Sequence, residues 1–299
     1  MKEKYIEKRF REESLRMINR VNHIIEEYSE KGYDLTLRQV YYQLVAADLI
    51  VNSERSYKNL GTLINDGRMA GLIDWNAIID RTRNLRGLRS DENPEDAISS
   101  AARIYRLDKW KNQFYHVEVW VEKDALAGIV GQICGRLDVD YFSCRGYTSQ
   151  SEMWRAAQRL SYYESIGQET VILHLGDHDP SGIDMSRDIV DRLEMFGVNP
   201  RFKRLALNMD QIEEFSPPPN PAKLSDSRAK GYITKFGKSS WELDALKPET
   251  LDALINVHVK QYINDYLLAE TVNQEKDDIA QMESVVERWD DIVEFINQN

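Results

Sequence analysis

The sequence predicts an α/β protein in which a helical unit precedes a mainly parallel β-sheet with helices on both faces. Apolar runs rich in β-branched residues predict strands near residues 115–121, 139–143, 170–176 and 201–207. Helical patterns lie between these runs, near 125–136, 149–163 and 183–196. This alternation of strand and helix favours parallel pairing of the strands.

We expect three segments along the chain. Residues 1–30 predict an amphipathic helix that packs on its neighbour or on a second subunit, with apolar positions at Leu15, Ile18, Val21 and Ile25. Residues 31–111 predict a small helical unit followed by a linker, which begins at Asp91 and becomes a helix. Residues 112–299 predict the sheet domain with a C-terminal helical extension.

The first helix of the second segment begins at Thr36, because Thr36 and Gln39 have the spacing of a capping box. One face of this helix is apolar and includes Tyr41, which we expect in the core, together with Leu37, Val40, Leu44 and Val45. Tyr42 lies outside that face, on the same side as Arg38. We therefore expect a phenol and a guanidinium side by side on an outward face.

The residues that follow fit a winged helix-turn-helix, of the CAP-like kind that binds DNA. Ser53 can cap a second helix, and a turn through Gly67 and Gly71 leads into residues 74–79. Four arginines come next, Arg81, Arg83, Arg86 and Arg89. Such a run can neutralise the phosphates of a duplex without reading its sequence, or it can be a solvated linker.

Two carboxylates end the predicted strand near 170–176. Asp177 and Asp179 are two residues apart, so in extended backbone they project from the same side. Like charges this close repel unless a cation neutralises them, and hard oxygen ligands favour magnesium. The alternative is a turn that caps the next helix, with Ser181 and Asp184 as a capping box.

A third carboxylate, Glu122, ends the predicted strand near 115–121. The carboxyl ends of parallel strands meet at one edge of a sheet, so Glu122 can converge with Asp177 and Asp179. A solitary glutamate in such a place would otherwise be solvated surface. The three acids together predict a magnesium site.

The segments Val-Glu122-Lys123-Asp-Ala and Gly-Asp177-His-Asp179-Pro-Ser-Gly-Ile-Asp resemble the TOPRIM domain of the A subunit of type IIB DNA topoisomerase, topoisomerase VI. They are also similar to its relative, the meiotic double-strand-break transesterase. The resemblance implies a Rossmann-like TOPRIM fold in which Glu122, Asp177 and Asp179 bind Mg²⁺ where a DNA phosphodiester is cleaved. It also places Lys123 beside the DNA.

The pattern Thr-x-Arg38-x-x-Tyr-Tyr42 is similar to the active-site tyrosine motif of the same family. The resemblance implies a catalytic set of Tyr42, Arg38 and Glu122, in which Tyr42 is the nucleophile. It further implies a homodimer, in which the tyrosine of one subunit meets the TOPRIM site of the other, and a separate ATPase subunit of the B type for strand passage.

Other interpretations stay open at this point. Tyr42 could pack in the core or merely contact DNA. A TOPRIM nuclease could use metal-bound water in place of tyrosine, and a non-catalytic DNA-binding protein could keep the acids for structure alone.

Composition restricts these functions further. The chain carries a net charge of −11, but residues 240–299 hold 14 acidic and 4 basic residues, whereas residues 36–111 hold 10 acidic and 12 basic residues. The acidic excess is therefore a C-terminal property and does not argue against DNA binding by the N-terminal half. We expect no membrane segment and no signal peptide, hence a cytoplasmic protein with reduced Cys134 and Cys144.

The C-terminal third is less informative. A proline stretch from Phe215 leads into a basic segment up to Lys238, which could grip DNA or be a solvated loop. Glu242 and Asp244 are expected to be surface residues or helix caps, with a role beside the acidic site as the alternative.

Overall fold

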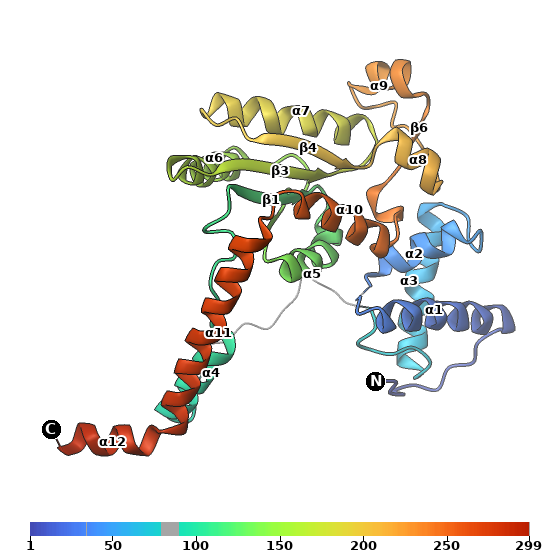
Figure 1. Cartoon of the computed structure of the whole chain (residues 1–299). Coiled ribbons are helices and arrows are strands. Elements are labelled where there is room, and N and C mark those ends of the chain that lie inside the picture. Colours follow the sequence, from blue (N-terminus) through green and yellow to red (C-terminus); the bar gives the residue numbers. More distant parts are fainter. Residues whose placement is uncertain (34, 79–89, 299) are drawn as a thin grey trace.

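The computed structural model describes residues 1–33, 35–78 and 90–298. A four-stranded parallel sheet forms the centre of the molecule, in the order β2-β1-β3-β4 (Figure 1). The strands are β1 (Tyr115–Val121), β2 (Asp140–Ser143), β3 (Glu169–Leu175) and β4 (Arg201–Ala206). The prediction of an α/β fold with a parallel sheet is therefore confirmed.

The register of the strands brings their carboxyl ends to one edge of the sheet. Val121 of β1 lies opposite Leu175 of β3 and Ser143 of β2, and Leu175 pairs with Ala206 of β4. The backbone N–H of Glu122 then donates to the carbonyl of Leu175 at 2.9 Å. The residues that follow β1 and β3 are thus held next to each other at this edge.

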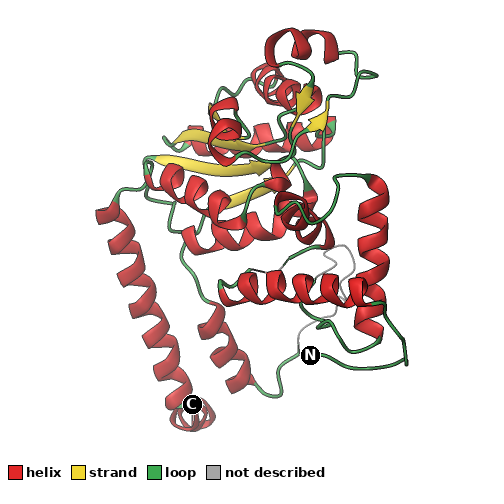
Figure 2. Ribbon diagram, turned by 90° about the vertical axis from the view of Figure 1, so that its right-hand side faces the viewer, coloured by secondary structure: helices red, strands yellow, loops and turns green. Residues whose placement is uncertain are grey.

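Helices cover both faces of the sheet (Figure 2). One face packs on α5 (Ala127–Leu137) and α10 (Pro248–Lys260), through Val119, Val121, Ile129, Ile133, Leu251 and Ile255. The other packs on α6 (Gln150–Ser165) and α7 (Pro180–Met195), through Trp120, Met153, Leu160, Ile172, Ile189 and Leu193. Burial of this apolar surface supplies most of the stability of the domain.

The N-terminal helices α1 (Glu12–Glu30), α2 (Leu37–Ala46) and α3 (Glu54–Met69) enclose a separate core. Both predicted caps are confirmed: Thr36 and Gln39 form a capping box, and the Ser53 side chain accepts from the N–H of Ser56. The predicted start of α1 is wrong, because the chain before Glu12 is held by backbone hydrogen bonds to Met69.

The wing of the predicted winged helix-turn-helix is not established. Within residues 1–33 and 35–78 the extended pairings are isolated bridges, Lys4 with Ala70 and Leu35 with Ile78. The three helices fit the predicted module, and its winged form stays a prediction.

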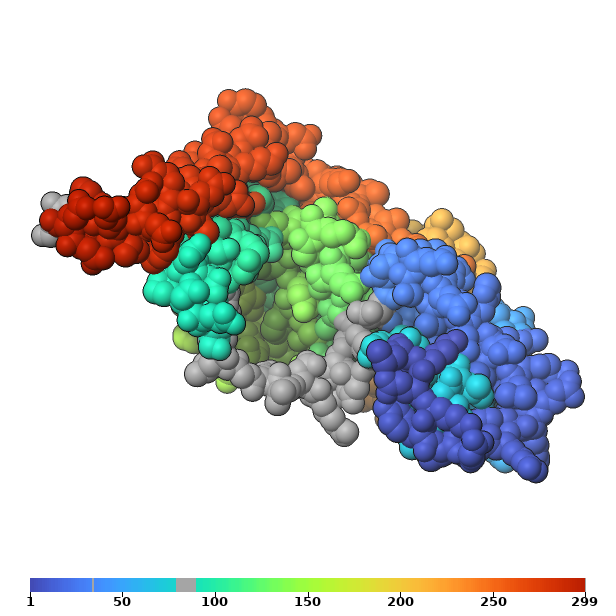
Figure 3. All heavy atoms as spheres, turned by 90° about the horizontal axis from the view of Figure 1, so that it is seen from below, coloured from blue at the N-terminus to red at the C-terminus, as the bar shows by residue number. Residues whose placement is uncertain are grey.

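The C-terminal part departs from the sheet as an arm. Helix α11 (Asp265–Glu287) runs beside α4 (Pro94–Ile104), where Tyr105 donates to Asp278 at 2.8 Å, and α12 (Trp289–Gln298) follows at its end. Figure 3 shows this arm and the N-terminal helices on opposite sides of α5. Among the helices of the described ranges, none has the length and apolar composition needed to cross a lipid bilayer.

Shorter elements connect the strands and helices of the sheet domain. They are η1 (Asp124–Leu126), α8 (Met209–Phe215), β5 (Asn220–Pro221), α9 (Ala229–Phe236), β6 (Ser239–Ser240) and η2 (Leu243–Ala245). Strands β5 and β6 pair antiparallel.

Candidate active site

Glu122 and Asp177 meet at the carboxyl edge of the sheet, where β1 and β3 end. The carboxylate oxygen Oε2 of Glu122 accepts the backbone N–H of Asp177 at 2.9 Å. Both residues are buried, with 8% and 6% of their surface exposed. The structure thus brings together two acids that lie 55 residues apart in the sequence.

Asp179 begins α7 as its N-cap, because its Oδ1 accepts the N–H of Gly182 at 2.6 Å. The predicted alternative placed the cap two residues later, with Ser181 and Asp184 as a capping box, and that position is wrong. The cap is Asp179 because Pro180 occupies the first helical position, where its fixed φ and missing N–H are tolerated. The same aspartate that could bind a cation therefore also fixes the helix.

Burial and like charge act together on these acids. Burial, followed by the charge of Asp177, raises the pKa of Glu122 to about 8, and Asp179 adds to this effect. Burial also raises the pKa of Asp177 to about 6, against the opposing effect of Lys123. A divalent cation would relieve this repulsion, so the donor set suits Mg²⁺.

Glycine makes room for the Glu122 carboxylate. A Cβ at Gly182 would lie 2.9 Å from Glu122 Oε2 and 2.3 Å from the carbonyl oxygen of Asp177. A Cβ at Gly176 would lie 2.9 Å from the same carboxylate oxygen. A larger side chain at Gly182 would require the loop backbone to move, and one at Gly176 would require the Glu122, His174 and Arg204 side chains to move.

Lys123 is the cation that faces Asp177. Its Nζ lies 2.9 Å from Asp177 Oδ2, 2.5 Å from Glu242 Oε2 and 3.3 Å from Asp244 Oδ1. Burial alone would lower the pKa of Lys123, but the three acids outweigh it and raise the pKa above its ordinary value. The ammonium group is thus engaged by acids within the protein, and its contact with DNA stays a prediction.

The residues described contain no cluster of three His, Cys, Asp or Glu side chains already arranged around one metal position. Asp177 Oδ2 is engaged by Lys123, whereas Glu122 and Asp179 each use one oxygen for a backbone amide. The second carboxylate oxygen of Glu122 and of Asp179 can serve a cation. A cation that binds Asp177 would share its carboxylate with Lys123 at Oδ2 and with the N–H of Leu243 at Oδ1.

Helix α2 presents Arg38 and Tyr42 to this edge of the sheet. Arg38 Nη2 lies 2.5 Å from Glu242 Oε2, and its Nε lies 2.7 Å from Asp244 Oδ2. The guanidinium carbon of Arg38 is 5.9 Å from the ring centroid of Tyr42. The two side chains are therefore neighbours, as the helical spacing predicts.

Our expectation that Tyr42 faces outward is wrong: its ring is buried, at 4% exposure. The turn η2 packs on α2 and covers this face. Burial, then the charges of Asp244 and Glu242, raise the pKa of the Tyr42 phenol above its ordinary value of 10, while Arg38 opposes them. Helical periodicity shows which face is polar, but not which distant segment covers it.

A cavity of about 530 Å³ joins these groups. Its walls come from α2 and the start of α3, from the ends of β1 and β3, and from residues around β5 and β6. It is lined by Arg38, Tyr41, Tyr42, Asn52, Ser53, Glu54, Tyr57, Lys123, Asp177, Asp179, Asn220, Pro221, Lys223, Ser240 and Glu242. Tyr42, Asp177 and Asp179 thus line one cavity within a single chain.

Glu242 and Asp244, expected to be surface residues or caps, lie beside the acidic site, which was the alternative. Asp244 is 1% exposed, and both acids bind the two basic groups Arg38 and Lys123. The backbone around Trp241 explains their position, because it pairs with His178 through two hydrogen bonds of 2.9 Å. The alternation of apolar Trp241 and Leu243 with these acids was the available signal, but their partners lie far away in the sequence.

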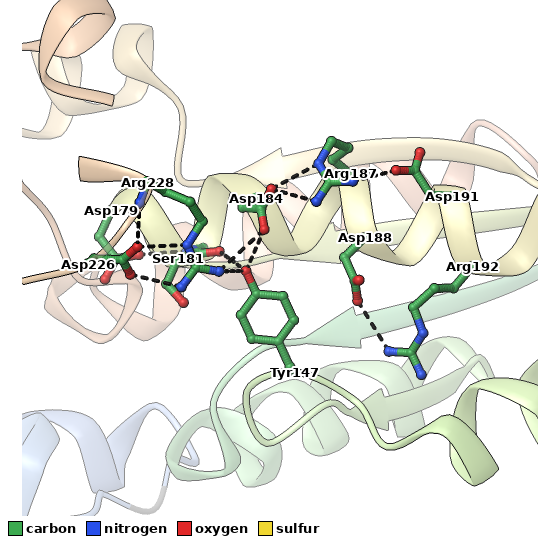
Figure 4. Close-up of polar contacts among 11 residues, drawn as sticks. Tyr147, Asp179, Ser181, Asp184, Arg187, Asp188, Asp191, Arg192, Asp226 and Arg228 are labelled. Carbon is green, nitrogen blue, oxygen red and sulfur yellow. Dashed lines mark hydrogen bonds and ion pairs between the residues drawn. The ribbon is translucent and has the colours of Figure 1, made fainter. Parts of the chain in front are cut away.

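A second polar cluster adjoins Asp179 on the outer side of α7 (Figure 4). The Tyr147 hydroxyl donates to Asp184 at 2.7 Å, and Arg228 reaches both Tyr147 and Asp184. Arg228 is also paired with Asp226 at 2.7 Å. These contacts attach Arg228, and with it the basic segment that ends at Lys238, to Tyr147 and Asp184. Lys223 of the same segment lines the cavity.

The four predicted DNA-contacting arginines, Arg81, Arg83, Arg86 and Arg89, lie outside the described residues. No known protein-family model matches the chain, and a search of curated proteins found no significant match. The geometry of the site is therefore the basis for assigning a function to this chain.

Proposed function

We propose that this protein cleaves DNA in a magnesium-dependent reaction in which Tyr42 attacks a phosphodiester. The observation that carries the proposal is the shared cavity, in which the Tyr42 side chain, Asp177 and Asp179 line the same space. A winged helix-turn-helix joined to a TOPRIM domain, as in the topoisomerase VI A subunit, is the arrangement that this function implies.

The residues of the chain suit separate steps of such a reaction. Glu122, Asp177 and Asp179 would hold Mg²⁺, which supplies charge stabilisation at a phosphate oxygen when bound. Arg38 offers a planar fork that can hold the phosphate. The Tyr42 oxygen forms a bond to phosphorus and loses its proton, while the bond from phosphorus to one deoxyribose oxygen breaks and that oxygen gains a proton.

The cavity also bears on the subunit arrangement. The family resemblance implies that the tyrosine of one subunit meets the acids of another. Here Tyr42 and Asp177 line one cavity in the same chain. We propose that the chain can therefore supply both parts itself, and that a homodimer would place one such site on each DNA strand. A separate ATPase subunit would serve strand passage and not cleavage.

One observation favours a second function, a TOPRIM nuclease that uses water. The Tyr42 phenol is buried and its pKa is raised, which disfavours the phenolate that attacks phosphorus. In a nuclease the acids and the metal would suffice, and Tyr42 would only pack against the substrate.

The test is incubation of the protein with supercoiled plasmid and Mg²⁺, followed by denaturation and separate assays of nicked DNA and of protein-bound DNA. The variants are Tyr42→Phe and Asp177→Asn, with Tyr57→Phe as the control because Tyr57 lines the same cavity. Transesterification predicts that Tyr42→Phe abolishes both products and Tyr57→Phe neither. Nicking that survives in Tyr42→Phe and fails in Asp177→Asn would identify the nuclease, and absence of both products from the wild-type protein would refute both functions.

A further inference from the structure

Arg204, in strand β4, contacts the loop that carries Asp177 and Asp179. Its guanidinium donates four hydrogen bonds to this loop and to the start of α7. Nη2 donates to the carbonyls of Gly176 at 2.9 Å and Asp177 at 2.6 Å, and Nη1 donates to the carbonyl of Gly182 at 3.0 Å and to Ser186 Oγ at 2.7 Å. One side chain thus ties both ends of the loop to the sheet.

The peptide group between Gly176 and Asp177 connects Arg204 to Glu122. Its carbonyl accepts from Arg204, and its N–H donates to Glu122 Oε2 at 2.9 Å. A trans peptide group is planar, with its C=O and N–H pointing in opposite directions. Fixing the carbonyl on one side therefore fixes the N–H on the other, and successive hydrogen bonds strengthen each other.

The packing around Gly176 supports this relation. A Cβ there would lie 2.9 Å from Glu122 Oε2 and 3.1 Å from Arg204 Nη1. The carboxylate and the guanidinium therefore both lie close to the position that a Cβ would occupy, which favours glycine there. Both contacts depend on the absence of a side chain at this position.

Arginine is suited to this place because of its donors. Its planar fork offers five N–H groups, and the four bonds above use two nitrogens of that fork. In the described part of the chain, no carboxylate forms an ion pair with Arg204, although the charges of Glu122, Asp177 and Asp179 are close enough to act on it. Its positive charge thus acts on the acids, while its hydrogen bonds go to backbone carbonyls and to Ser186 Oγ.

We propose that Arg204 is the positioning residue of the acidic site, which holds the 176–182 loop and, through the Gly176–Asp177 peptide, the Glu122 carboxylate. The inference rests on the proposed function only for the identity of the ligand, a divalent cation. Arg204 acts through Glu122, Asp177 and Asp179 and does not contact the reacting atoms.

The first test measures positioning without a metal. Amide hydrogen exchange of residues 176–186 is compared in wild type, Arg204→Lys and Arg204→Met, all in EDTA. The matched control is Arg159→Lys, because Arg159 forms two hydrogen bonds of 2.7 and 2.8 Å to Glu118, away from this loop. We expect exchange in the loop to rise tenfold or more in both Arg204 variants and to stay unchanged in the control.

The second test measures the binding of Mn²⁺ alone by calorimetry, under conditions in which the wild type and the variants are folded to the same extent. Loss of a group that orients metal ligands weakens binding by about 10- to 100-fold, and we expect this loss in Arg204→Lys but not in Arg159→Lys. Gly176→Ala adds a Cβ that would lie 2.9 Å from Glu122 Oε2 and 3.1 Å from Arg204 Nη1. This variant should weaken Mn²⁺ binding by a similar factor.

Two results would overturn the inference: loop exchange equal to wild type in a folded Arg204→Lys, or wild-type Mn²⁺ affinity in that variant. Failure of the proposed function would give a different result. The wild-type protein itself would then bind no Mn²⁺ and cleave no DNA. Amide exchange would still decide whether Arg204 positions the loop.

Discussion

Replacing Glu122 by glutamine should stabilise the metal-free protein while it removes a candidate metal ligand. The pKa of Glu122 is raised to about 8 by burial and by Asp177, from an ordinary value of 4.5. A carboxyl whose pKa is higher in the folded state opposes folding increasingly as pH rises from 4.5 through 8. Glutamine has nearly the same shape and does not titrate.

The size of the effect follows from the difference between the two pKa values. At pH 7 the unfolded chain favours the ionised group by about 2.5 pH units, which corresponds to about 3 kcal/mol at most. At pH 5 the same reasoning leaves less than about 1 kcal/mol. At pH 7 the folded protein holds Glu122 largely as the neutral acid, which glutamine replaces with a slightly different hydrogen-bond geometry, so we expect a net gain of about 2 kcal/mol.

Urea denaturation in EDTA at pH 5 and pH 7 measures this difference. Glu118→Gln is the matched comparison with the opposite expected sign, because Glu118 is a buried glutamate of β1, at 1% exposure, whose pKa is lowered. A variant Glu122→Gln that is less stable than wild type at pH 7, or equally stabilised at both pH values, would refute our account of the acidic site.

Three further predictions test the same structure. Glu118→Gln should destabilise the fold by about 3 kcal/mol at pH 7, because burial of Glu118 is outweighed by Arg159 and His116, which hold its pKa at about 2. The stability that the ionised Glu118 contributes is present above pH 4.5 and is lost as pH falls toward 2. Urea titrations across this pH range will measure the loss. Gly182→Ala should lose about 2 kcal/mol of stability or more and weaken Mn²⁺ binding, because its Cβ would lie 2.3 Å from the Asp177 carbonyl oxygen. The control Gly231→Ala, whose Cβ would have no neighbour within 4 Å, should be neutral or gain up to about 1 kcal/mol in the same denaturation assay. Arg38→Met should destabilise by about 2 kcal/mol, and a double-mutant cycle with Asp244→Asn should show coupling of about 1 kcal/mol or more; additivity of the two changes would contradict a direct ion pair.

The sheet and its helices were predictable because each element carries its own local signal. The predicted strand near 115–121 matches β1 (Tyr115–Val121), and the capping box at Thr36 begins α2 where expected. These features depend on neighbours in sequence, such as side-chain alternation or a side chain that reaches three residues along. The carboxyl edge of a parallel sheet then explains why Glu122 approaches Asp177.

The parts that could not be predicted depend on contacts between distant segments. Tyr42 is buried because η2 covers α2, and nothing in the helix sequence records that cover. Glu242 and Asp244 appear as ordinary surface acids until Arg38 and Lys123 are placed beside them. Asp179 illustrates competition between local signals, since it and Ser181 can both cap α7 and the position of Pro180 decides between them.

The most direct measurement is the attachment point of cleaved DNA. A labelled duplex is incubated with the protein and Mg²⁺, the mixture is denatured and digested with protease, and the nucleotide-bearing peptide is sequenced by mass spectrometry. The account predicts a single modified residue, Tyr42, and no adduct when EDTA replaces Mg²⁺. DNA cleaved without any peptide adduct, or an adduct on another residue, would contradict it.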